Sequence, residues 1–94
     1  MTTLAEIAHA VCAHYDVTSD ELFRRTRGSR SVVQARQVFM WLAKDRTIKS
    51  YPEIGRYLGR DHTTVIHGVR ATDNQLATDD RFYSEVMAIK GEFR

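Results

Sequence analysis

Residues 60–69 read Arg-Asp-His-Thr-Thr-Val-Ile-His-Gly-Val, and this stretch decides which fold the 94-residue chain is expected to adopt. It follows Gly59 and opens a long segment of helically spaced apolar residues. The pattern is typical of a turn followed by the exposed start of a helix, with Asp61 as its N-cap. The polar first turn carries several hydrogen-bonding groups and two methyl groups, which are suited to contacting base edges in a major groove.

A short amphipathic segment precedes this turn and is expected to form a helix at about 52–58. Ser50 and Glu53 match a capping box, and Pro52 suits a first helical turn, where its missing N–H costs nothing. With a second helix at about 62–77, this predicts a helix-turn-helix, whose second helix enters the major groove by its N-terminal end. The alternative is that the polar first turn only begins the helix. The residues predicted to lie in the groove are Arg60, Asp61, His62, Thr63, Thr64 and His67.

The rest of the chain also shows helical periodicity and no lasting strand pattern. Further helices are expected at about 4–15, 19–23, 32–45 and 80–90. Thr3 with Glu6, and Ser31 with Gln34, match capping boxes for the first and third of these. There is no repeat and no linker composition, so the expected fold class is all-α. We predict a single domain over residues 1–94, a compact bundle of about six helices.

A basic segment lies between the second and third of these expected helices. Arg24, Arg25, Arg27 and Arg30 fall within seven residues, and eleven of the fourteen basic residues of the chain are arginine. Arginine makes bidentate contacts with phosphate and guanine, so such a loop can follow a DNA backbone or enter a narrow minor groove. A solvated loop with scattered charge is the alternative. Predicted backbone or minor-groove contacts are Arg25, Arg27, Arg30, Arg36, Lys44 and Lys49.

Composition argues against several other classes of protein. A hydrophobic content of 43% is ordinary for a globular chain, and the net charge of +2 alone says little about nucleic acid. No apolar run approaches the roughly 18 residues of a membrane span, and no signal peptide is visible. The single cysteine, Cys12, cannot form an internal disulfide. We therefore expect a cytoplasmic protein without a membrane partner.

The sequence does not suggest an enzyme. Neighbouring histidines are spaced by five, which does not place both rings on one helix face, and no cysteine or carboxylate cluster completes a zinc site. Cys12 sits on an apolar stripe, where a buried inert thiol is expected. The chain contains no Gly-x-x-x-x-Gly-Lys-Thr/Ser loop. We expect no catalytic residue, no metal, no cofactor and no nucleotide binding.

The motifs above resemble the C-terminal DNA-binding domain of the bacterial replication initiator DnaA, over nearly the whole chain. The resemblance rests on Pro52-Glu53-Ile54-Gly55, on Gly59-Arg60-Asp61-His62-Thr63-Thr64-Val65 with His67, and on Arg30-Ser31, Arg36-Gln37 and Leu42-Ala43-Lys44. It implies a Trp-repressor-like helical bundle that recognises the DnaA box, an asymmetric AT-rich nonamer. It also implies that Tyr51 and Pro52 lie near the backbone or a thymine methyl, and that Arg30, Arg36 and Lys44 contact phosphates.

The chain departs from the family pattern at several positions. Gly59 stands alone where the family usually has two glycines, and Ala35 replaces a common proline. Gly28 occupies the position of the family's minor-groove arginine, for which Arg27 is the nearest substitute. Trp41 stands where the family usually has a smaller apolar residue, either as a core filler or as a partner-binding ring.

The chain is expected to bind DnaA-box-like sites in double-stranded DNA. Because it has no loop that could bind the phosphates of ATP, it is not expected to act as an initiator itself. It would then be a regulator or competitor in replication initiation or transcription, and its start at Met1 favours a stand-alone protein over an excised domain. An asymmetric site suits a monomer. The alternative is a protein-interaction module that keeps the fold but has weak or lost DNA binding, with Trp41, Tyr51 and Tyr57 as anchors and a partner in replication control.

Overall fold

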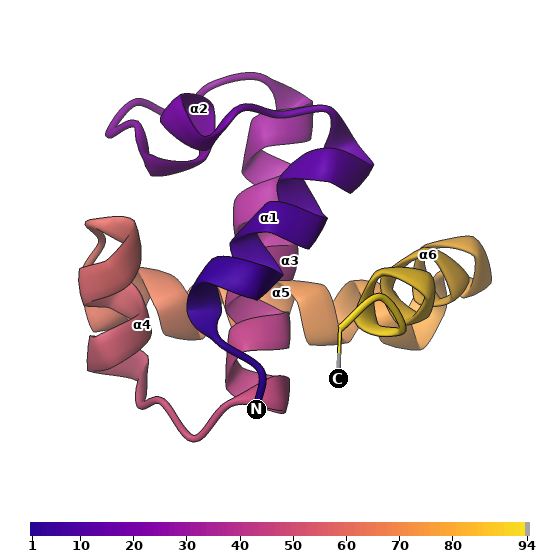
Figure 1. Ribbon diagram of the computed structural model, residues 1–94. Helices are drawn as coiled ribbons and strands as arrows, with labels where there is room; N and C mark the ends of the chain where they lie inside the picture. Colours follow the sequence, from indigo (N-terminus) through magenta and orange to yellow (C-terminus); the bar gives the residue numbers. More distant parts are fainter. Residues whose placement is uncertain (94) are drawn as a thin grey trace.

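The computed structural model describes residues 1–93, and every regular element in that range is an α-helix (Figure 1). The elements in chain order are α1 (Leu4–Tyr15), α2 (Ser19–Phe23), α3 (Arg30–Arg46), α4 (Tyr51–Leu58), α5 (His62–Thr78) and α6 (Asp80–Lys90). The expected all-α fold is confirmed, and five of the six helices begin and end within one residue of the predicted positions. No helix in the described part of the chain is long and apolar enough to cross a membrane.

The helices begin where side chains replace missing backbone partners. Reciprocal capping boxes form between Thr18 and Glu21 before α2 and between Ser50 and Glu53 before α4. The predicted Ser31–Gln34 box is wrong. The third helix begins earlier, at Arg30, because the Ser29 hydroxyl accepts the hydrogen bond of the Val32 N–H at 3.3 Å and caps the helix there.

The core is centred on α3, which runs through the middle of the molecule between α1 and α5 (Figure 1). Val38, Phe39 and Leu42 on this helix are fully buried, and apolar residues from every other helix join them in one core cluster. Tyr57 is 37% exposed and stacks one ring face on Phe39, with ring centroids 5.7 Å apart.

Helices α4 and α5 form the predicted helix-turn-helix around residues 59–61. Gly59 ends α4 in the left-handed conformation, with φ at 73°, and the Arg60 N–H then donates to the Gly55 carbonyl at 2.8 Å. The chain passes so close to α4 that a Cβ built on Gly55 would lie 2.5 Å from the Arg60 carbonyl oxygen. This close return of the chain sets the position of α5 relative to α4.

Candidate nucleic-acid interface

The first turn of α5 is presented to solvent. Asp61, His62, Thr63 and Thr64 are all exposed, and the Asp61 carboxylate accepts the hydrogen bond of the Thr64 N–H at 3.0 Å. This bond is the main cause that lowers the pKa of Asp61, so its carboxylate is ionised at neutral pH. His62 and Thr63 belong to the first turn, beyond this cap, and their side chains are available to a partner.

A groove brings this end of α5 together with the arginine-rich loop, although the two are more than thirty residues apart in the sequence. The groove holds about 540 Å³. Arg25 and Arg27 line it from the loop, and Thr64 and His67 line it from α5, with Arg60 between them. With Arg36, which lines the groove from α3, the structure gathers six of the predicted site residues on one concavity.

The groove is strongly basic. Its lining includes Arg25, Arg27, Arg36, Arg60 and His67, and no described aspartate or glutamate is among the residues that line it. Such a concentration of positive charge favours a polyanion, since the field of neighbouring charges adds up within a concave surface. Gln37 and Thr26, which were not predicted as site residues, also line the groove. Helical spacing along α3 relates Gln37 to Val33 and Met40, which line the groove as well, and would have identified it.

Gly28, at the centre of the arginine-rich loop, has a backbone conformation that disfavours larger residues. Gly28 has a positive φ of 82°, and a Cβ there would lie 3.0 Å from a Val32 methyl group. An arginine would be strained at this position in the observed conformation. Arg27, its neighbour, is exposed and lines the groove.

Arg36, a predicted phosphate contact, lies in the wall of this groove but is buried. Its side chain is only 6% exposed, and its guanidinium donates to the carbonyl oxygens of Leu22, Glu21 and Arg24 at 2.7–2.9 Å, and also to that of Arg27. Burial is the main cause that lowers the pKa of Arg36, followed by the nearby charges of Arg60 and Arg24. Four of its five N–H groups donate to carbonyls inside the protein. Arg36 therefore forms part of the groove wall, and its guanidinium is not free to bind a phosphate.

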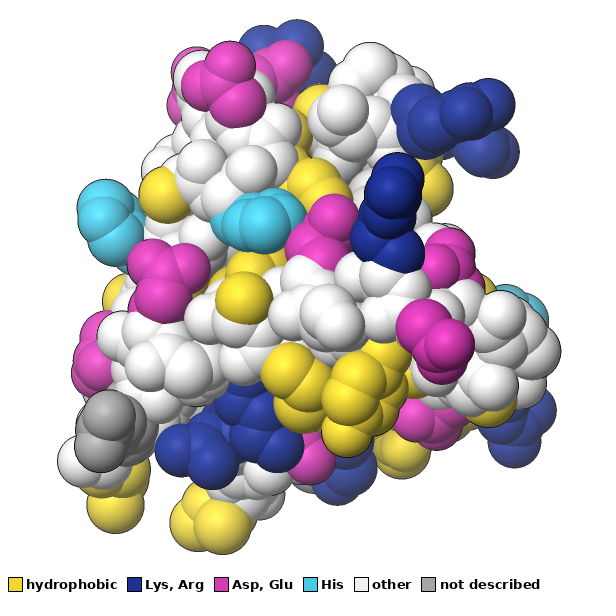
Figure 2. Space-filling view, turned by 90° about the vertical axis from the view of Figure 1, so that its right-hand side faces the viewer, with side chains coloured by type: hydrophobic (Ala, Val, Ile, Leu, Met, Phe, Trp, Pro, Cys, Tyr) yellow, Lys and Arg dark blue, Asp and Glu magenta, His cyan; other side chains and the backbone are white. Residues whose placement is uncertain are grey.

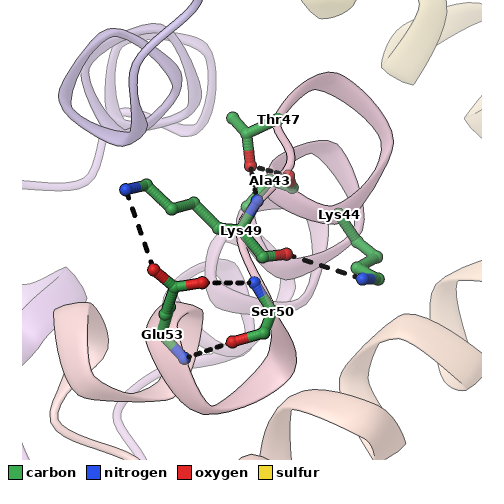
Figure 3. Close-up of polar contacts among 6 residues, drawn as sticks. All are labelled: Ala43, Lys44, Thr47, Lys49, Ser50 and Glu53. Atoms are coloured by element: carbon green, nitrogen blue, oxygen red, sulfur yellow. Dashed lines mark hydrogen bonds and ion pairs between the residues drawn. The ribbon is translucent and has the colours of Figure 1, made fainter.

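The predicted residues of the α3–α4 connection form a second group (Figure 3). Lys44 Nζ lies 4.7 Å from the centre of the Tyr51 ring and donates to the Lys49 carbonyl at 3.5 Å. Lys49 Nζ lies 3.9 Å from Glu53 Oε2, and Pro52 is exposed in the first turn of α4. None of these residues lines the basic groove, so the structure divides the predicted site into two patches.

Arg30 belongs to neither patch. It is exposed at the start of α3 and lines a separate hollow of about 290 Å³ together with the carboxylates of Asp79 and Glu85. Figure 2 views the molecule from the α6 side, and acidic side chains are scattered among basic, histidine and hydrophobic ones over that face. This mixture contrasts with the groove at the other end of α5.

Trp41 and Cys12 both make contacts within the fold. Trp41 is half-buried, its Nε1 donates to Asp73 Oδ1 at 2.7 Å, and Lys90 Nζ lies 5.9 Å from the centre of its ring. Cys12 is partly buried, and burial, with a smaller contribution from Glu21, raises the pKa of its thiol. The described residues contain no group of three or more potential metal ligands.

Comparison with known proteins identifies relatives of this chain. A family model described as the bacterial dnaA protein helix-turn-helix matches residues 4–71, which extend from α1 into α5. The chromosomal replication initiator protein DnaA of Sphingopyxis alaskensis is 46% identical over 89 residues, 94% of this chain and 19% of the relative. Its counterparts are 44% identical in Bartonella quintana, over 93% of this chain and 18% of the relative, and 39% identical in Bacteroides thetaiotaomicron, over 94% and 19%. The chain thus spans about a fifth of the length of these relatives.

Proposed function

The chain belongs to the bacterial DnaA helix-turn-helix family, and we propose that it binds double-stranded DNA at DnaA-box-like sites. In this proposal the exposed first turn of α5 enters the major groove. Asp61, His62 and Thr63 contact base edges there, and Thr64 and His67 complete the contact surface.

The observation that carries the proposal is the basic groove beside that first turn. Arg25, Arg27 and Arg60 lie within the same concavity as Thr64 and His67 of α5. Phosphates flanking the contacted bases would be neutralised by these arginines, while Arg27 is the residue best placed to enter a minor groove. The patch formed by Lys44, Lys49, Tyr51 and Pro52 would contact the DNA backbone on the side of α5 opposite the basic groove.

We also propose that these 94 residues act on such sites by occupancy, as a regulator or competitor. The sequence contains no Gly-x-x-x-x-Gly-Lys-Thr/Ser motif, so the segment by itself supplies no phosphate-binding loop for ATP. Its effect on replication or transcription would then depend on its concentration relative to other proteins that bind the same DNA. A single helix-turn-helix suits an asymmetric site bound by a monomer.

The proposal is tested by fluorescence anisotropy on a duplex that contains the asymmetric AT-rich nonamer and on a scrambled duplex of equal composition. Titrations between 50 and 200 mM salt should show tighter binding to the nonamer. They should also give a log–log slope of about −4 to −6, for roughly five or six neutralised phosphates. Selection from a random pool would return the preferred site and its symmetry.

The protein-interaction alternative predicts a different outcome in the same titrations. A module that had lost DNA binding would show no preference for the nonamer and only weak binding that disappears at moderate salt. Equal affinity for the two duplexes across the salt series would contradict sequence-specific binding by this chain. Trp41, one of the anchors considered for a protein partner, already bonds to Asp73 within the fold.

A further inference from the structure

We propose that Arg36 is a positioning residue of the DNA interface, which holds the arginine-rich loop in place and makes no contact with phosphate. This inference rests on the proposed function, because it concerns the groove through which the chain would bind DNA. It follows from the hydrogen bonds of one buried guanidinium and from the conformation of the segment that accepts them.

The Arg36 guanidinium reaches from α3 to four backbone carbonyls within residues 21–27. Its Nε donates to the Leu22 carbonyl at 2.9 Å, and its Nη2 donates to the carbonyls of Glu21 at 2.7 Å and Arg24 at 2.8 Å. Its Nη1 donates to the carbonyl of Arg27. A guanidinium has five N–H donors in a rigid planar fork, so four of the five are already used.

These acceptors include the C-terminal carbonyls of α2, which need partners from elsewhere. Helix α2 has only five residues, carries no basic side chain in its last turn, and ends at Arg24 in an extended conformation. Helix ends leave carbonyls without intrahelical partners, and a helix this short is not stable in isolation. A buried positive charge at the C-terminus of α2 supplies both the donors and a favourable interaction with the helix dipole.

The same hydrogen bonds place the arginines that face the groove. Arg25 and Arg27 are exposed and lie in an irregular loop between two anchored points, the carbonyls of Arg24 and Arg27. Arg60 strengthens the first point, since its Nη2 also donates to the Arg24 carbonyl at 2.6 Å. Arg36 therefore ties the loop to α3, and Arg60 ties it to the turn before α5. Loss of the Arg36 fork would free the loop and disperse its charges.

A direct phosphate contact makes an opposite prediction for the variant Arg36→Lys. Lysine keeps the charge on a flexible stem, so a phosphate contact would survive with little change in salt dependence. A positioning role needs the planar fork, which lysine cannot reproduce. We expect Arg36→Lys to lower the steepness of the salt dependence by about 1.8, the value for two phosphates released from Arg25 and Arg27, although no charge is removed.

A double-mutant cycle tests the route by which Arg36 acts. In a background of Arg25→Gln and Arg27→Gln, Arg36→Lys should change the affinity for the nonamer by less than about twofold, because the contacts that it organises are already absent. Arg46→Gln removes an exposed charge from the same helix and serves as the matched control, with unchanged affinity. Additive losses in the cycle, or an unchanged salt slope for Arg36→Lys, would overturn the proposal.

Two measurements keep the test decisive if Arg36→Lys weakens the fold. In the folded variant, amide hydrogen exchange should accelerate in residues 22–28 while α5 keeps its protection. In the wild-type protein, the Arg36 Nε–H signal in NMR spectra should exchange slowly with solvent and stay unshifted when DNA is added. A fast-exchanging Nε–H in the free protein would show that Arg36 does not hold the loop, and a signal that shifts when DNA is added would show direct contact; either result would overturn the proposal. If wild-type protein fails to bind DNA, the proposed function fails, whereas slow Nε–H exchange would still show that Arg36 holds the loop.

Discussion

His62 is the residue whose replacement most directly tests base contact. It is exposed in the first turn of α5, outside the core and outside the capping bond that Asp61 makes. We expect His62→Ala to cost about 1–3 kcal/mol of binding free energy on the nonamer and to relax specificity there, because a base contact is lost. The measurement is the ratio of affinities for nonamer and scrambled duplexes.

The control for this variant is His9→Ala, which removes another exposed histidine, on α1, and should leave both affinities unchanged. If His62→Ala weakened binding to the two duplexes equally, its assignment to base contact would be wrong, and it would instead contact the backbone.

Individual residues also show where sequence reasoning reaches its limit. The exposure of His62 and Thr63 was predictable, since a capped helix start after a glycine turn faces solvent. The burial of Arg36 was not, because it depends on carbonyls 9–15 residues earlier that meet α3 only in the folded molecule. Arginine type and spacing gave no means of separating this buried residue from the exposed Arg27.

At the scale of helices, the capping carboxylates predict how stability responds to acid. Hydrogen bonds from backbone N–H groups and from cap hydroxyls lower the pKa values of Glu21, Glu53 and Asp61 in the folded state. Groups with a depressed folded pKa stabilise the protein above their unfolded pKa of about 4, and this contribution is lost as the pH falls through the folded value. We therefore expect the melting temperature to fall as the pH is lowered from 5 to 2.

Variants that cannot titrate check the source of this effect. Glu21→Gln, Glu53→Gln and Asp61→Asn keep a side-chain hydrogen-bond acceptor but have no ionisable group. The melting temperature of the combined variant should therefore fall less between pH 5 and pH 2 than that of the wild type. Melting by circular dichroism at each pH measures it. If the melting temperature of the combined variant fell as steeply as that of the wild type, groups other than these three carboxylates would cause the acid sensitivity.

The turn between α4 and α5 gives a second prediction for an element. A Cβ at Gly55 would meet the backbone oxygen of Arg60 at 2.5 Å, and backbone cannot move aside as a flexible side chain can. We expect Gly55→Ala to destabilise the domain by about 1–3 kcal/mol, as overpacking does. The DNA affinity of the folded variant should also decline, because the turn would have to move and would shift α5 relative to α4. Chemical denaturation and anisotropy measure the two effects.

Gly91→Ala is the matched control, since its added Cβ would meet its nearest neighbour at an ordinary 3.5 Å. Equal stabilities for the two alanine variants would mean that the turn can relax at no cost, and the close return of the chain would not fix α5.

Helices were more predictable from sequence than the surfaces they build. Ser50, Glu53 and Asp61 marked two helix starts correctly because a cap is a local event within four residues. The start of α3 was predicted wrongly, since Ser29 and Ser31 both offer a cap and the structure uses Ser29, directly after Gly28 with its positive φ. Local patterns of this kind compete on nearly equal terms until tertiary contacts decide between them.

At the scale of the whole molecule, the site depends on how α3 and α5 cross. The fully buried Thr72 hydroxyl lies 2.9 Å from the Gly68 carbonyl of its own helix and 3.2 Å from the Gln37 carbonyl of α3, so the middles of the two helices are in direct contact. The crossing brings the arginine-rich loop beside the first turn of α5 and leaves Lys44 and Tyr51 in a separate patch. The sequence predicted candidate residues for both patches, but their division into two patches follows from this packing geometry.

The shared core gives the last prediction, because one cluster around α3 supports every helix. Leu42→Ala removes a fully buried side chain, and we expect a loss of about 2–5 kcal/mol of unfolding free energy through lost burial and an unfilled void. Ile48→Ala, at a position 99% exposed, should change it by no more than about 0.5 kcal/mol. If the domain unfolds as one unit, circular dichroism and Trp41 fluorescence will report the same transition in both variants. Separate transitions would show that the helix-turn-helix unfolds independently of α1 and α3.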